Sequence, residues 1–77
     1  MGVQTERLAQ IARGLAVGLT RGGQVIFDGP QTSIRIWPDD RTGETRFQIR
    51  GYWPESEIAD RTDDQLRELL NSWPKLR

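Results

Sequence analysis

The sequence predicts an α+β fold, a two-layer sandwich in which both helices cover one face of a three-stranded antiparallel sheet. Apolar residues recur at helical spacing near both ends of the chain. Between them lie three short segments rich in β-branched and aromatic residues, and two of these alternate polar with apolar positions. The expected order is α-β-β-β-α. With 77 residues we expect a single small domain, 1–77, with one face of the sheet left open.

The first helix is predicted from one apolar face, formed by Leu8, Ile11, Ala12, Leu15 and Leu19. Thr5 is a suitable N-cap, and the glycine pair 22–23 is a suitable end because glycine readily adopts left-handed backbone. Gly14 and Gly18 fall inside this helix, where each costs about 1 kcal/mol relative to alanine. We therefore expect a close neighbour packed against them.

Three strands are predicted at 24–28, 32–37 and 44–53. The segments 28–31 and 38–43, which contain glycine, proline and aspartate, are expected to be the turns between them. Short turns between alternating segments indicate an antiparallel meander.

The second helix is predicted after a polar connection at 55–61, in which Ile58 is expected to fill the core. Thr62 and Gln65 match a capping box, and Pro74 is expected to stop the helix. Its apolar face consists of Leu66, Leu69, Leu70 and Trp73.

Alternation along the strands predicts which side chains point away from the helices. If Ile34 and Ile36 face the core, the opposite face carries a set of arginine, aromatic and amide side chains. These candidate binding residues are Arg35, Trp37, Arg46, Gln48, Arg50 and Tyr52. Ile26 joins this open face if Val25 and Phe27 lie in the core.

The chemistry of this face allows three interpretations. Guanidinium groups bind carboxylates or phosphates, and aromatic rings fill pockets of a protein partner or stack on bases. The face can therefore bind a protein or a nucleic acid, or it can be a solvated surface whose arginines pair with neighbouring acidic residues. An uncovered sheet of this kind can also pair with a second copy of the chain as a homodimer.

Each of the three tryptophans precedes a proline, at 37–38, 53–54 and 73–74. In each pair we expect proline to end an element and tryptophan to seal its last turn or rung. The alternative is an aromatic groove for a proline-rich ligand, which requires these rings to lie together on the surface.

An acidic run lies near the C-terminus, formed by Glu55, Glu57, Asp60, Asp63 and Asp64. Helix capping and the helix dipole account for Asp63 and Asp64. The alternatives are a contact patch for a basic partner and a cation site, although the order of a calcium loop is absent.

The composition argues against catalysis. The chain has no cysteine and no histidine, which removes the thiolate nucleophile, the commonest general base and the commonest zinc ligands. Its single lysine, Lys75, lies near the C-terminus, and no nucleophile–base pair is apparent. We expect neither enzymatic activity, nor a metal, nor a cofactor.

The α-β-β-β-α order and the Gly29–Pro30 pair after the first strand resemble the double-stranded RNA-binding domain. In that family the second helix begins with lysines that contact phosphates, and the Gly-Pro loop carries a histidine. Here the second helix begins with Asp63 and Asp64, which would repel RNA, and histidine is absent. The resemblance therefore implies the topology and not the RNA site.

The functional expectation is a small binding module that contacts a protein partner, of the inhibitor or adaptor type. A chain of this size without cysteine resembles small proteins that bacterial or phage mobile elements encode, anti-CRISPR proteins among them. A nucleic-acid-binding domain using the same face is the alternative. No apolar stretch is long enough to span a membrane and no secretory signal is apparent, so the cytoplasm is the expected compartment.

Overall fold

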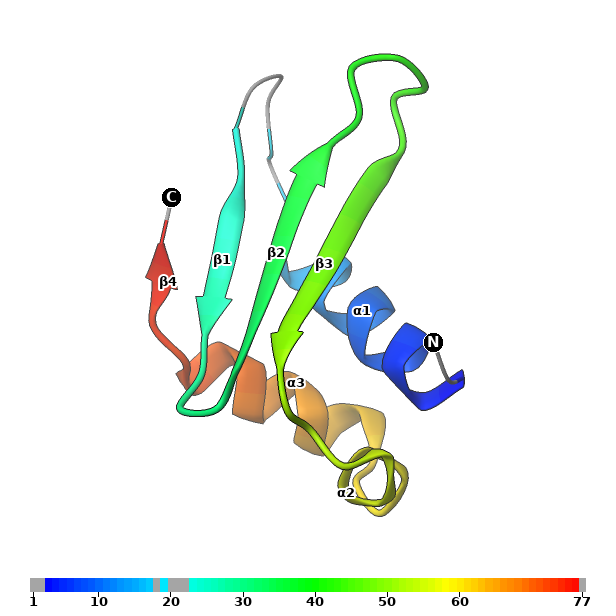
Figure 1. Cartoon of the computed structure of the whole chain (residues 1–77), viewed down its shortest axis with the longest axis vertical. Coiled ribbons are helices and arrows are strands. Elements are labelled where there is room, and N and C mark those ends of the chain that lie inside the picture. Colours follow the sequence, from blue (N-terminus) through cyan, green and yellow to red (C-terminus); the bar gives the residue numbers. More distant parts are fainter. Residues whose placement is uncertain (1–2, 18, 20–22, 77) are drawn as a thin grey trace.

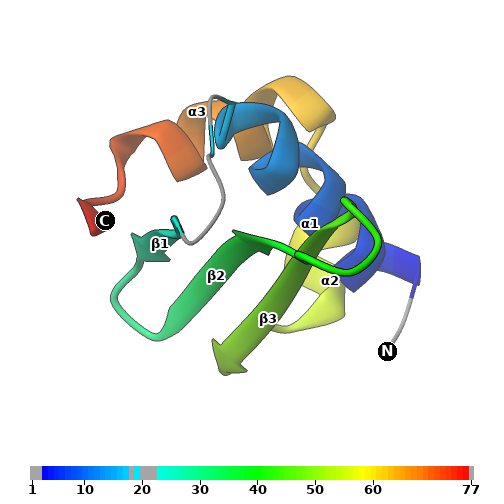
Figure 2. The ribbon, with the colours of Figure 1, turned by 90° about the horizontal axis from the view of Figure 1, so that it is seen from above.

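The chain forms an antiparallel sheet with its helices packed on one side, as Figures 1 and 2 show. The computed structural model describes residues 3–17, 19 and 23–76. Its elements are α1 (Val3–Leu15), β1 (Val25–Asp28), β2 (Thr32–Pro38), β3 (Thr45–Gly51), α2 (Glu55–Ala59), α3 (Asp63–Ser72) and β4 (Lys75–Leu76). The α+β class and the antiparallel sheet predicted from the sequence are confirmed.

The prediction of three strands was wrong, because the sheet has four strands in the order β3-β2-β1-β4. The additional strand, β4, pairs antiparallel with β1 and aligns Leu76 with Ile26 and Lys75 with Phe27. A two-residue strand is too short to show alternation in the sequence. Pro74 indicated only the end of a helix, whereas its carbonyl oxygen also accepts a hydrogen bond of 2.9 Å from the backbone N–H of Asp28.

The core lies between the sheet and the helices. Leu8 of α1, Leu66 and Leu70 of α3, and Phe27 and Ile34 of the sheet are fully buried. Burying aliphatic and aromatic side chains contributes about 1.5–3 kcal/mol each. Packing therefore fixes which face of the sheet is covered.

Helix α1 is displaced toward the N-terminus relative to the prediction. It starts at Val3, so Thr5 lies within it rather than capping it, and it ends at Leu15. Gly14 has open space where a Cβ would be, so the expected close neighbour is absent at this position. Gly18 and Gly22, which the prediction placed inside and at the end of the helix, lie outside the described residues.

Strand β3 ends at Gly51, two residues before the predicted end. Gly51 has a φ of +89°, which side chains rarely allow, and a Cβ here would collide with the carbonyl oxygen of Gln31. The chain turns at this residue, and the alternation of the strand stops with it.

The connection at 55–61 contains a short helix, α2, that was not predicted from the sequence. A helix of five residues is too short to show helical periodicity in the sequence. Ile58 of this helix is 1% exposed, as expected for a core plug. The capping box of α3 is confirmed: the backbone N–H of Gln65 donates to the Thr62 hydroxyl, and the backbone N–H of Thr62 donates to the Gln65 side chain.

Candidate binding face

Five of the six predicted site residues lie on the uncovered side of the sheet. The pairing of β2 with β3 sets Arg35 opposite Gln48 and Trp37 opposite Arg46, and Arg50 lies opposite Ser33. The intervening Ile34 and Ile36 are fully buried on the helix side. These five residues therefore occupy three consecutive rows of what we call the open face.

Two apolar side chains extend this face across β1 and β4. Val25 and Phe27 are buried, so Ile26 points to the open side, as expected. Ile26 aligns with Arg35 of β2 on one side and with Leu76 of β4 on the other. Leu76 is 51% exposed, so the middle row combines exposed aliphatic surface with a guanidinium.

The Arg35 side chain is held in place by two neighbours. Its guanidinium carbon lies 4.5 Å from the centroid of the Trp37 ring. Its Nε donates a hydrogen bond of 2.6 Å to the side-chain oxygen of Gln24. A cation over an indole gains about 0.5–1 kcal/mol at an exposed site. The two side chains therefore present a fixed cationic and aromatic surface.

Arg46 is committed to an ion pair with Asp39 at the end of β2. The hydrogen bond from Arg46 lowers the pKa of the Asp39 carboxyl, and the backbone N–H of Arg41 contributes in the same direction. The carboxylate in turn raises the pKa of Arg46. This pairing of a face arginine with a turn aspartate was one of the sequence-based alternatives.

Arg50 differs from the other two arginines of the face. It is exposed, and within the described residues its guanidinium makes no hydrogen bond or ion pair. A guanidinium without an internal partner keeps all five donors available for a carboxylate.

The structure places Tyr52 elsewhere. It follows the turn at Gly51, where alternation has ended, and it lines a cavity with Trp53 and Trp73. Tyr52 is 70% exposed at this position. The alternative of an aromatic groove required the three tryptophan rings to lie together, and two of them, Trp53 and Trp73, meet in this cavity. Trp37 lines a separate cavity with Arg13.

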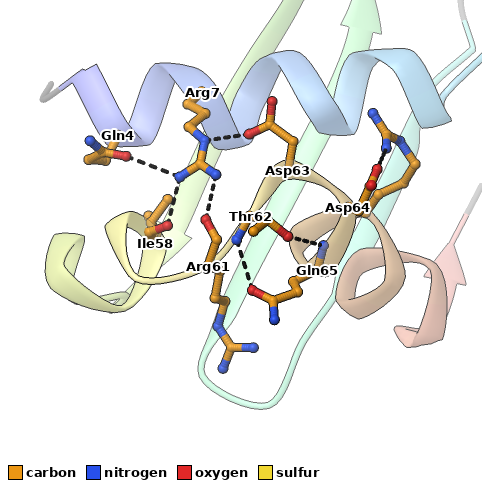
Figure 3. Close-up of polar contacts among 9 residues, drawn as sticks. Gln4, Arg7, Ile58, Arg61, Thr62, Asp63, Asp64 and Gln65 are labelled. Atoms are coloured by element: carbon orange, nitrogen blue, oxygen red, sulfur yellow. Dashed lines mark hydrogen bonds and ion pairs between the residues drawn. The ribbon is translucent and has the colours of Figure 1, made fainter.

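The acidic run takes part in contacts between the helices, shown in Figure 3. Asp63 pairs with Arg7 of α1, and Asp64 pairs with Arg67 one turn further along α3. Arg7 also donates a hydrogen bond of 2.8 Å to the carbonyl oxygen of Ile58. Among the residues that the structure describes, no three acidic side chains converge as ligands for a metal ion.

Comparison with known proteins gave no match: no family model fits the chain, and neither the curated proteins nor the solved structures contain a significant relative. The resemblance to the double-stranded RNA-binding domain therefore rests on the predicted element order and on Gly29–Pro30, and the observed order adds α2 and β4. Within the described part of the chain, none of the helices combines the length and the apolar character needed to cross a membrane.

Proposed function

We propose that this chain is a non-enzymatic binding module, of the inhibitor or adaptor type, that contacts a partner protein through the open face. The observation that carries the proposal is the mixture on one uncovered sheet surface. Arg35 contacts Trp37 and Gln24, Arg50 has no hydrogen bond or ion pair among the described residues, and the aliphatic side chains Ile26 and Leu76 lie on the same face.

This mixture suits a protein interface. Arginine and tryptophan are enriched among the residues that dominate binding energy, and a side chain already fixed loses little entropy on binding. Ile26 and Leu76 add apolar area next to the guanidiniums. The best partner surface is therefore apolar with a carboxylate placed to meet Arg50.

The charge balance favours a protein over a nucleic acid. Arg46 is neutralised by Asp39, and Asp28 aligns with Ser33 in the same row as Arg50. Nucleic-acid affinity depends on several unpaired cations that replace counterions on phosphates. Among the described residues, Arg35 and Arg50 are the open-face arginines without an acidic partner, and Asp28 lies in the row of Arg50. Two such cations on a face that also carries Asp28 and Asp39 are a poor match for a phosphate backbone.

Matched variants test the proposal. Arg50→Ala removes the unpaired guanidinium of the open face, whereas Arg67→Ala removes an exposed arginine of α3 on the other layer. Immobilised wild-type chain is used to isolate partners, and each purified partner is then titrated against both variants. We expect Arg50→Ala to weaken binding about tenfold or more and Arg67→Ala to leave it unchanged. Equal affinity of wild type and Arg50→Ala for every partner would overturn the proposal.

A second titration addresses nucleic acids directly. Duplex and single-stranded oligonucleotides are titrated at two salt concentrations. A phosphate-binding face gives an affinity that falls by about 0.9 log unit per contact for each tenfold rise in salt. We expect no binding at low salt. Salt-sensitive binding that is lost in Arg50→Ala would show that the open face binds a nucleic acid and not a protein.

A further inference from the structure

An aromatic groove lies at the end of the molecule away from the β2–β3 turn. It is a cavity of about 270 Å³ between the β1–β2 turn, the segment after β3, and helix α3. Its walls include Tyr52, Trp53, Pro54 and Trp73. None of these side chains belongs to the five residues of the open face, so the groove is a separate surface.

The rings are held by backbone features that leave little freedom. Gly29 allows Trp73 to approach, since a Cβ on Gly29 would lie 2.6 Å from the indole ring. The backbone N–H of Tyr52 donates to the carbonyl oxygen of Gln31 at 3.1 Å, and the hydroxyl of Thr32 donates to the carbonyl oxygen of Tyr52 at 2.6 Å. The segment that carries Tyr52 and Trp53 is thus fixed to the β1–β2 turn.

The ring geometry is suited to flat apolar ligands. The centroids of Trp53 and Trp73 are 5.4 Å apart and their planes are inclined by 36°. Both rings are half-buried, whereas Tyr52 is 70% exposed beside them. Neighbouring rings of this kind form the shallow apolar slots in which proline rings of an extended peptide pack.

The groove contains hydrogen-bond donors that have no partner among the described residues. The Tyr52 hydroxyl and the Arg61 guanidinium belong to exposed residues and make no hydrogen bond or ion pair within the described residues. The indole N–H of Trp53 also lacks an acceptor there, but it is buried, so the first two groups are the donors open to a ligand. A polyproline II segment exposes its carbonyl oxygens, and its prolines have no N–H. The ligand offers acceptors where the groove offers donors.

The charge at the rim indicates what flanks the prolines. Glu57 lines the groove, is exposed, and has no ion-pair partner among the described residues. The segment 55–77 around it carries four basic and six acidic side chains. A basic residue beside the prolines would pair with Glu57, while Arg61, which lines the same groove, would meet carbonyl oxygens of the peptide.

From these observations we propose that the aromatic groove binds a proline-rich segment of a partner in the polyproline II conformation, with a flanking arginine paired to Glu57. The proposal is supported by the shape of the groove, by its two inclined indole rings and by its unpartnered donors, which together fit one extended peptide. The site is independent of the open face, so either surface can fail without the other.

The test uses three synthetic peptides and the full chain. One peptide contains a Pro-x-x-Pro core with a flanking arginine, the second has the prolines replaced by alanine, and the third lacks the arginine. Binding is followed by NMR through the indole N–H signals of the three tryptophans. The first peptide is expected to shift the signals of Trp53 and Trp73 and to leave that of Trp37 in place.

Variants locate the contact. Tyr52→Ala truncates an exposed side chain and is expected to weaken the first peptide about tenfold or more. Glu57→Gln is expected to weaken the first peptide but not the third. Arg67→Ala removes an exposed arginine of α3 that lines neither the groove nor the open face, so it is the matched control and is expected to change nothing.

Three results would overturn the groove proposal. The first is no shift of the Trp53 and Trp73 signals at millimolar peptide. The second is equal binding of the alanine peptide. The third is loss of binding in Arg50→Ala with a shift of Trp37, which would assign the peptide to the open face.

Discussion

The guanidinium of Arg7 lies 2.5 Å from the carboxylate of Asp63 and ties α1 to the first turn of α3 (Figure 3). The same guanidinium donates to the backbone carbonyl oxygens of Ile58 and Arg61. One side chain of α1 thus satisfies acceptors at the end of α2 and in the loop that follows it. This side chain therefore links α1 to both of the later helices.

Arg7→Ala should therefore destabilise the fold. Hydrogen bonds to charged groups contribute about 1.5–3 kcal/mol, and partial exposure of this pair reduces the expected loss to about 1–2 kcal/mol. The free energy of unfolding in urea measures it. Arg67→Ala is the control, since its exposed pair with Asp64 within one helix contributes about 0.5 kcal/mol or less. Equal losses in the two variants would show that the carbonyl contacts of Arg7 contribute nothing.

Substituting the two glycines with positive φ should distinguish the cost of left-handed backbone from the cost of a steric collision. Gly43 has a φ of +74° and open space around it, whereas Gly51 has a φ of +89° and Gln31 where a Cβ would be. Gly43→Ala should cost about 1–2 kcal/mol for the left-handed backbone alone. Gly51→Ala should cost clearly more and lower the melting temperature further. Similar melting temperatures would mean that the β1–β2 turn yields to the added methyl group.

The pair of Asp39 and Arg46 predicts a pH dependence. The pKa of Asp39 is lowered in the folded chain from its usual 3.8, so the carboxylate stabilises the fold above that value. This contribution is lost as the pH falls through the lowered pKa. An NMR titration of the Asp39 carboxyl should show the pKa rising in Arg46→Ala, although the backbone N–H of Arg41 still holds it below 3.8. An unchanged pKa would contradict the assigned cause.

The capping box of α3 gives a local test of stability. Thr62→Ala removes the acceptor of the Gln65 N–H and should cost about 1 kcal/mol. Thr5→Ala is the control, because Thr5 lies inside α1 and its hydroxyl makes only a 3.4 Å contact with Glu55. Unfolding curves of the two variants check the difference, and a control as unstable as Thr62→Ala would contradict it.

Periodicity in the sequence was sufficient where segments are long. Leu66 and Leu70 identified α3, and Ile34 and Ile36 identified the buried face of β2, because burial repeats at the period of each element. Five residues of the candidate site followed from the same alternation. Tyr52 did not, since the positive φ of Gly51 depends on the close approach of Gln31 and cannot be read from neighbours in the chain.

Periodicity in the sequence could not predict very short elements or contacts between residues far apart in the chain. Strand β4 exists because α3 delivers Lys75 to the edge of β1 beside Phe27, a contact that local sequence does not encode. The meeting of Trp53 with Trp73 has the same origin, because it depends on where α3 ends relative to β3. The sequence alone did not show that the rings of two Trp-Pro pairs come together, and the structure was needed to locate the groove.

Strand β4 also determines the order in which the sheet comes apart. Its two residues are the outer partner of β1, and Phe27 and Lys75 are far apart along the chain. Pairing β4 with β1 closes a long loop and gains few hydrogen bonds, so this pairing has a low free energy of local unfolding when the end of α3 frays. In hydrogen–deuterium exchange, the amide of Asp28, bonded to Pro74, should lose protection before the amides shared by β2 and β3. We therefore expect the sheet to open first between β1 and β4, where Ile26 aligns with Leu76.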